Sequence, residues 1–290
     1  MPQLPRSSAA TARRQYSRRP GLLTAVAVSS LLILTACTTS PTGRSQLMLI
    51  SPESAIVQSK TAYLTTMGEL DKDNKLVDDP LMADRVATIT GRLVTEAVAL
   101  YPNSKNWEWS VAIIDDDDTV NAWCMAGGRM AAYTGLFEQL QLTDDEFAQI
   151  MGHEISHALA NHTAERMSRA MAINLGVIAA GVASDNSGVT MAGAAVAAKL
   201  ALELPNSRVA EAEADRIGIE LATRAGYDPA AAVTLWQKMG SLSEDRPPEF
   251  LSTHPAPENR QGKLSELVPE MRTLNPDRRM AAVTPITIVK

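Results

Sequence analysis

The pentapeptide His153-Glu154-Ile155-Ser156-His157 decides the fold of this chain more than any other stretch. In an α-helix its two histidines lie one turn plus about 40° apart, so both imidazoles leave the same face and can bind one metal ion. Glu154 lies about 100° around that helix, where its carboxylate can reach a water beside the metal without ligating the metal. An H-E-x-x-H pattern on a helix is typical of a catalytic zinc site.

The residues before the pentapeptide predict that it lies on a helix. Thr143 is followed three residues later by Glu146, which is a capping box, and the acidic residues between them suit the positive end of a helix dipole. Apolar residues then recur at helical spacing, namely Phe147, Ile150, Met151, Ile155, Ala158 and Leu159. The alternative is a core helix with two ordinary buried histidines, and a third ligand decides between the two interpretations.

Two acids one turn apart supply the candidate third ligand. Glu211 and Asp215 lie on a predicted helix whose other face is apolar. Glu211 can bind the ion while Asp215 accepts a hydrogen bond from the N–H of a ligating histidine. Alternatively the acids form a solvated stripe paired with Arg208 and Arg216. Glu213 is expected on the opposite, exposed side and is the next candidate if Glu211 is not the ligand.

Together these motifs resemble the gluzincin peptidases of HtpX, Oma and CAAX-prenyl-protease type, metallopeptidase family forty-eight. The resemblance runs from about Leu81 to Leu267. It also includes Asn121-Ala122-Trp123, Gly127-Gly128-Arg129, Tyr133-Thr134-Gly135-Leu136, and His254-Pro255 with Arg260. The sequence departs from the family pattern at Cys124-Met125-Ala126, where more regular apolar residues are usual, and this departure concerns the substrate groove more than the metal.

The resemblance implies a zinc endopeptidase that holds one Zn²⁺ per chain. It implies His153, His157 and Glu211 as the zinc ligands and Glu154 as the catalytic residue. His254 and Arg260 are expected to act beside them in catalysis. For His254 three interpretations stay open: an exposed loop histidine, a donor to the tetrahedral oxyanion, or a fourth zinc ligand that closes the site until substrate displaces it.

We expect an α+β, zincin-like fold that is mostly helical, with a short mixed sheet and an edge strand over the active site. Strands are predicted over 107–114, 120–125 and 129–133, and helices over 52–70 and 80–100. The edge strand, with Asn121, Ala122 and Trp123, is expected to bind an extended peptide by strand addition. The four aspartates 115–118 fit a solvated turn. Two stretches rich in small residues over 168–204 predict a helical hairpin. This hairpin either packs as part of the core or forms a lid over the active site.

Residues 1–36 predict a secretory signal peptide of the lipoprotein type. They contain five arginines, no acid and an apolar run that is shorter than the roughly 20 residues of a membrane span. The run ends in Leu34-Thr35-Ala36-Cys37, a lipobox, so lipidation is expected at Cys37. Thr38 rather than Asp follows the cysteine, so the resemblance to bacterial lipoproteins implies sorting to the outer membrane, facing the periplasm. An uncleaved anchor in the inner membrane is the alternative, and export by the general or the twin-arginine route stays open.

The remaining chain is predicted to contain a lipidated tether over 37–50, a peptidase domain over 51–272 and a tail over 273–290. Without the signal, the net charge falls from −6 to about −11, so nucleic acid is not an expected partner. The lipid anchor is therefore expected to hold the chain at the membrane. Cys124, the second of two cysteines, is interpreted as a buried thiol, with an intermolecular disulfide as the alternative.

Family and location together imply unfolded or misassembled envelope proteins as substrates. The alternative function is that of a noncatalytic, zinc-containing chaperone or assembly factor for outer-membrane proteins. Because Glu154 is present, the sequence favours catalysis. No oligomeric state is predicted.

Overall fold

The computed structural model describes residues 37–183, 207–242, 248–254 and 259–290. The chain divides into a unit of residues 1–37 and a unit of residues 38–290, and the second unit contains the elements described below apart from Cys37 itself. The strands are β1 (Cys37–Thr39), β2 (Ser45–Leu47), β3 (Ser110–Ile114), β4 (Ala122–Met125), β5 (Arg129–Tyr133) and β6 (Thr287–Val289). The α-helices are α2 (Pro52–Lys72), α3 (Pro80–Leu100), α4 (Gly135–Leu140), α5 (Asp144–Leu159), α6 (His162–Ala183), α8 (Ala231–Ser241), α9 (Glu249–Thr253) and α10 (Arg260–Leu274). Residues 207–224 are also helical, and Pro102–Asn106 form a 3₁₀ turn.

A mixed sheet of four strands in the order β4-β5-β3-β6 forms the β part of the fold. β3 pairs in parallel with β5 and β6, whereas β4 pairs antiparallel with β5, so that β4 is an edge strand. The α+β class with a short mixed sheet is therefore confirmed, and the three predicted strands are found within one to three residues of their expected bounds.

Helices cover both faces of this sheet. Side chains alternate between the two faces along each strand, so each face contributes apolar residues to a separate core cluster. In β3, Val111 and Ile113 face the main core with residues of α3 and α5, whereas Ala112 and Ile114 face Tyr63 and Met67 of α2. All five residues of β3 are buried, as expected for a central strand covered on two sides. α2 and α3 begin where Ser51 and Asp79 cap their first turns before Pro52 and Pro80.

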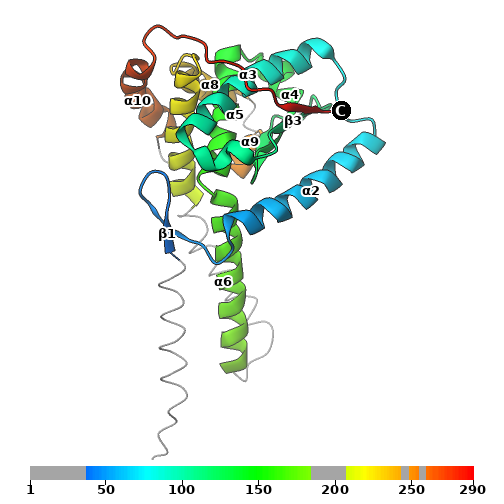
Figure 1. Ribbon diagram of the computed structural model, residues 1–290, viewed down its shortest axis with the longest axis vertical. Coiled ribbons are helices and arrows are strands. Elements are labelled where there is room, and N and C mark those ends of the chain that lie inside the picture. Colours follow the sequence, from blue (N-terminus) through cyan, green and yellow to red (C-terminus); the bar gives the residue numbers. More distant parts are fainter. Residues whose placement is uncertain (1–36, 184–206, 243–247, 255–258) are drawn as a thin grey trace, which may run out of the picture. The chain divides into compact units, whose positions relative to one another are not determined.

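The central helix α5 begins with the predicted capping box. Thr143 accepts a hydrogen bond from the Glu146 amide, and the Glu146 carboxylate accepts one from the Thr143 amide. Figure 1 shows α5 among the other helices, and it packs against α3, α8, α6 and the edge strand β4. Contacts on all sides bury nearly every α5 residue, so the positions of its side chains are fixed.

Two segments near the ends of this unit differ from the predicted organisation. The region 37–50, expected as a tether, contains a two-stranded sheet of β1 and β2. We refer to residues 38–47 as the N-terminal hairpin. It packs on α6, and its Ser40 and Gln46 are buried. The tail expected over 273–290 ends in β6, which pairs with β3. Both differences arise because backbone pairing in three-residue strands leaves almost no side-chain pattern in the sequence.

The helical hairpin predicted over 168–204 is described only in part. α6 contains its first arm, and residues 184–206 lie outside the described residues. Among the described helices, none combines the length and the apolar character that a membrane span requires.

Candidate metal centre and catalytic site

Two glycines let the helix of the pentapeptide approach the helix of residues 207–224 closely. A Cβ added at Gly218 would lie 2.8 Å from the His153 amide nitrogen, and one added at Gly152 would lie 2.8 Å from the Gly218 carbonyl oxygen. Because neither residue has a side chain, the two helix backbones are in contact. This contact places Glu211 opposite the histidines, seven residues before Gly218 on the second helix.

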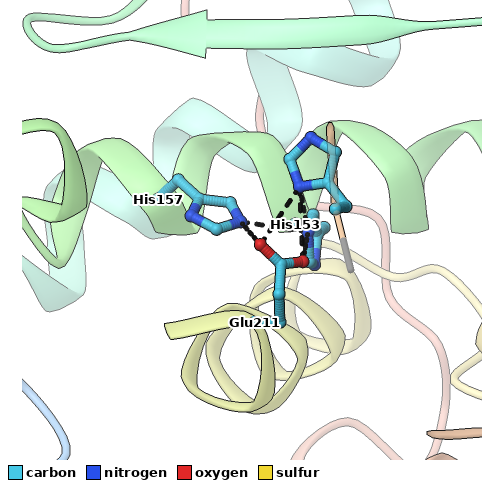
Figure 2. A group of neighbouring side chains, drawn as sticks. His153, His157 and Glu211 are labelled. Atoms are coloured by element: carbon cyan, nitrogen blue, oxygen red, sulfur yellow. Dashed lines mark hydrogen bonds and ion pairs between the residues drawn. The ribbon is translucent and has the colours of Figure 1, made fainter. Parts of the chain in front are cut away.

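Glu211 and the two histidines of the pentapeptide converge on one point (Figure 2). His153 Nε2 lies 3.1 Å from His157 Nε2 and 3.3 Å from Glu211 Oε2, and His157 Nε2 lies 3.4 Å from Glu211 Oε1. Donors at 2.0–2.1 Å from one ion in a tetrahedral arrangement lie about 3.4 Å apart. The donor types and their spacing therefore fit a zinc ion. Since Glu211 is buried, the alternative of a solvated acidic stripe does not describe this helix.

His254 completes the cluster from the C-terminal end of α9. Its Nδ1 lies 3.4 Å from His153 Nε2 and 3.3 Å from each carboxylate oxygen of Glu211. His153, His157, Glu211 and His254 each offer one donor atom, and these four atoms lie within 4.8 Å of one another. The His254 side chain is only 12% exposed and its ring stacks on Phe250, so it is not an exposed loop histidine. Its position is that of a fourth donor.

The charges of this cluster follow from burial and mutual hydrogen bonds. Burial lowers the pKa of His153, but hydrogen bonds to Asp215 and Glu211 outweigh it and raise this pKa to about 9. Burial dominates at His157, where it holds the pKa well below the usual value. Burial would raise the pKa of Glu211, yet hydrogen bonds with His153, His157 and His254 lower it strongly. Glu211 is therefore ionised, which is the state that a ligand requires.

Asp215 and Arg260 both contact the ring of His153. His153 Nδ1 lies 3.0 Å from Asp215 Oδ1, as expected of a carboxylate that orients a ligating imidazole. Arg260 forms an ion pair with the same Asp215 oxygen and stacks over Trp236, with its guanidinium carbon 3.7 Å from the ring centroid. Arg260 was expected among the catalytic residues, but it does not line the cavity described next. Its ion pairs are with Asp215 and, at 3.6 Å, with Oε2 of the ligand Glu211.

A cavity of about 470 Å³ lies beside the cluster. Glu154, His157, Glu211 and His254 line it, and so do Asn121 to Cys124 of the edge strand region. The structure thus places the predicted substrate strand and two of the predicted catalytic residues, Glu154 and His254, on one cavity. The lining also includes the basic side chains of α6, Arg166 and Arg169.

Glu154 is buried, yet its Oε1 atom has no hydrogen-bond partner among the described residues. The nearest ring nitrogen, His254 Nε2, lies 3.4 Å away without hydrogen-bond geometry. Burial raises the pKa of Glu154, and the nearby His254 and His153 oppose this shift. An unpartnered carboxylate oxygen with a raised pKa, facing a cavity beside a metal centre, fits a general base.

Two buried residues of the site were missed or misplaced by the sequence analysis. His162, to which no role was given, lies with its Nδ1 2.8 Å from His157 Nδ1. Glu213, expected at the surface, is buried and its Oε2 lies 3.1 Å from His162 Nε2. Glu213 is buried because the N-terminal hairpin covers that side of its helix. The pattern of apolar and polar residues along the helix does not predict this contact. The position of His162 only five residues after His157 was the available signal.

The two cysteines lie in different surroundings. Cys124 of β4 is buried, and burial together with the Glu154 charge holds its pKa well above the usual value, which agrees with the buried thiol that was expected. Cys37 is exposed at the start of β1.

Residues 80–268 match Peptidase family M48. The mitochondrial metalloendopeptidase OMA1 of Arabidopsis thaliana is 33% identical over 191 residues, which cover 65% of this chain and 38% of the relative. The mitochondrial metalloendopeptidase OMA1 of Bos taurus is 31% identical over 241 residues, covering 79% and 45%. The beta-barrel assembly-enhancing protease of Escherichia coli (strain K12) is 31% identical over 208 residues, covering 69% and 41%. The chain matches less than half the length of each of these relatives.

Proposed function

The chain belongs to peptidase family M48, and we propose that it is a zinc-dependent endopeptidase of the bacterial cell envelope. The observation that carries this proposal is the convergence of His153, His157 and Glu211 beside the unpartnered oxygen of Glu154. Three such ligands leave a fourth position, which water or substrate takes when His254 does not occupy it, as a catalytic zinc site needs.

His153, His157 and Glu211 would hold the zinc ion, and Asp215 would orient the His153 ring. A bound zinc ion supplies Lewis acidity toward the scissile carbonyl and the attacking water. Glu154 takes a proton from that water at Oε1 and returns it to the leaving amine. Burial of Glu154 supports this role, since it brings the affinity of the carboxylate for protons closer to what a base needs near neutral pH.

The substrate is proposed to bind as an additional strand along β4. β4 is the edge of the sheet and lines the cavity that contains Glu154, so an extended peptide paired with it would pass the metal centre. Main-chain pairing recognises extended backbone with little selectivity for side chains. This supports unfolded or misassembled polypeptides as the substrate class, because folded proteins keep most strands paired and protect the strands at their sheet edges.

We place the protein at the periplasmic face of the outer membrane, held by a lipid on Cys37. The arginine-rich, apolar segment 1–36 and its lipobox support this location. The name of the beta-barrel assembly-enhancing protease connects that relative with the assembly of beta-barrels. This favours envelope proteins as the proposed substrates here. A purely noncatalytic chaperone is less well supported, since such a protein does not need a buried, unpartnered Glu154 oxygen.

Removal of the metal tests the proposal. Purified protein should contain one zinc per chain and cleave a reduced, alkylated protein substrate, and a chelator should abolish both. One equivalent of Zn²⁺ should then restore cleavage. Glu211→Ala should neither retain zinc nor respond to its addition, whereas the control Glu220→Ala on the same helix should behave as wild type. Cleavage that continues in metal-free protein would refute the assignment.

A further inference from the structure

A continuous chain of polar contacts starts at His157 Nδ1, the ring nitrogen that does not face the metal cluster. His157 Nδ1 lies 2.8 Å from His162 Nδ1, and His162 Nε2 lies 3.1 Å from Glu213 Oε2. His162 and Glu213 are both buried, with 5% of their surfaces exposed. None of the roles proposed above uses either residue.

The hydrogen-bond chemistry of this chain determines the tautomer of each ring. A neutral imidazole that binds zinc through Nε2 carries its proton on Nδ1. His157 Nδ1–H must therefore donate to His162 Nδ1, which leaves the proton of His162 on Nε2. His162 Nε2–H then donates to the Glu213 carboxylate, which in its ionised form has acceptors and no donor. One direction of donation thus satisfies all three groups and points the lone pair of His157 Nε2 at the metal position.

The N-terminal hairpin holds Glu213 at the end of this chain. Thr42 Oγ1 donates to Glu213 Oε1 at 2.5 Å, and Arg44 Nε donates to Glu213 Oε2 at 3.0 Å. Arg44 also forms two parallel hydrogen bonds of 2.7 Å with the carboxylate of Glu165 on α6. Such paired contacts fix the planar guanidinium in one orientation. The Arg44 side chain is 17% exposed and those of both acids are 3% exposed, so solvent screens these contacts weakly.

We propose that Thr42 and Arg44 of the N-terminal hairpin are positioning residues for the metal ligand His157 and act on it through Glu213 and His162. The proposal rests on the proposed zinc site, and it adds a structural role for the segment next to Cys37. Contacts of this kind behind a ligating histidine typically change metal affinity by about 10- to 100-fold. The hairpin therefore sets how firmly the enzyme retains its metal.

Four variants test the proposal. His162→Phe removes the acceptor of His157, whereas His162→Gln keeps an amide oxygen that can accept and an NH₂ that can donate to Glu213. Arg44→Ala removes the Arg44 contacts with Glu213 and Glu165 and leaves those made by Thr42 and Gln46. Thr42→Val removes one hydroxyl and serves if Arg44→Ala fails to fold. Arg272→Ala is the control, because Arg272 is an exposed arginine that also pairs with an acid, Asp228.

The readouts are the zinc dissociation constant, by chelator competition, and the solvent exchange of the His157 Nδ1 proton in the zinc-loaded, ¹⁵N-histidine-labelled chain. We expect His162→Phe to weaken zinc binding by about 10- to 100-fold and His162→Gln to recover most of that loss. Arg44→Ala should weaken binding by about tenfold, at the low end of this range, and speed the exchange. Thr42→Val should speed the exchange to a smaller extent.

Two failures can be told apart. If the wild type binds no zinc, or if His153→Ala binds it normally, the proposed metal site is wrong and the inference falls with it. If the wild type binds zinc but Arg44→Ala and Thr42→Val match Arg272→Ala in both readouts, the metal site stands and the role of the hairpin is refuted.

Discussion

At the scale of single residues, His254 has the most ambiguous role in the sequence and a definite position in the structure. Its Nδ1 is as close to Glu211 and His153 as the proposed ligands are to one another, which favours a fourth ligand over an oxyanion donor. A fourth ligand would occupy the position that water or substrate needs.

We therefore predict that His254→Ala raises peptide hydrolysis at matched zinc occupancy. If His254 instead donates to the oxyanion, the same change should lower turnover by roughly 100-fold or more. The sign of the rate change for a short fluorogenic peptide decides between the two roles. His254→Phe, which keeps an aromatic ring against Phe250, controls for lost packing.

The residues of the metal cluster could be predicted from spacing, whereas their outer contacts could not. His153 and His157 are four positions apart on one helix, and so are Glu211 and Asp215 on another, so each pair lies on one helix face. The burial of Glu213 depends on the N-terminal hairpin, which lies about 170 positions earlier in the sequence. No helical pattern contains such information, so a buried outer contact was predicted to be an exposed acid.

At the scale of elements, the contact between α5 and the helix of residues 207–224 determines whether the ligands meet. Its glycines lie at the closest approach of the two backbones. In an interior without free space, an added methyl group must push the helices apart.

Gly218→Ala should therefore lower the free energy of unfolding by about 1–3 kcal/mol and weaken zinc binding, because Glu211 moves with its helix. Gly68→Ala in α2 is the matched control, since a Cβ there meets nothing within 4 Å. It should leave zinc binding unchanged and stabilise the helix by up to about 1 kcal/mol. Equal zinc affinity and equal unfolding midpoints in the two variants would contradict this account of the contact.

Elements with their own local signals were predictable. The capping box marks the start of α5, and an N-cap residue followed by proline marks the starts of α2 and α3. Apolar runs mark β3, β4 and β5. β6 and the N-terminal hairpin were not predicted, because their strands have three residues each and depend on pairing partners elsewhere. Pairing of this kind is a property of the assembled sheet.

At the scale of the whole molecule, the proposed location depends on Cys37. Changing Cys37 to Ser should abolish lipidation and move the folded, signal-cleaved protein from the membrane fraction to the soluble envelope fraction. The change does not touch the metal site, so the released protein should bind zinc and cleave peptides as the wild type does. Retention of the cleaved variant in membranes would show that another segment anchors it.

The central claim is that the convergence of two helices makes this chain a zinc endopeptidase with Glu154 as its base. The most direct test compares zinc content and hydrolysis of an unfolded protein by the purified wild type and by Glu154→Gln. We predict about one zinc per chain in both proteins and a loss of at least about 100-fold in the rate of the variant, because the ligands remain while the proton acceptor is removed. Hydrolysis by zinc-loaded Glu154→Gln at the wild-type rate would contradict the account.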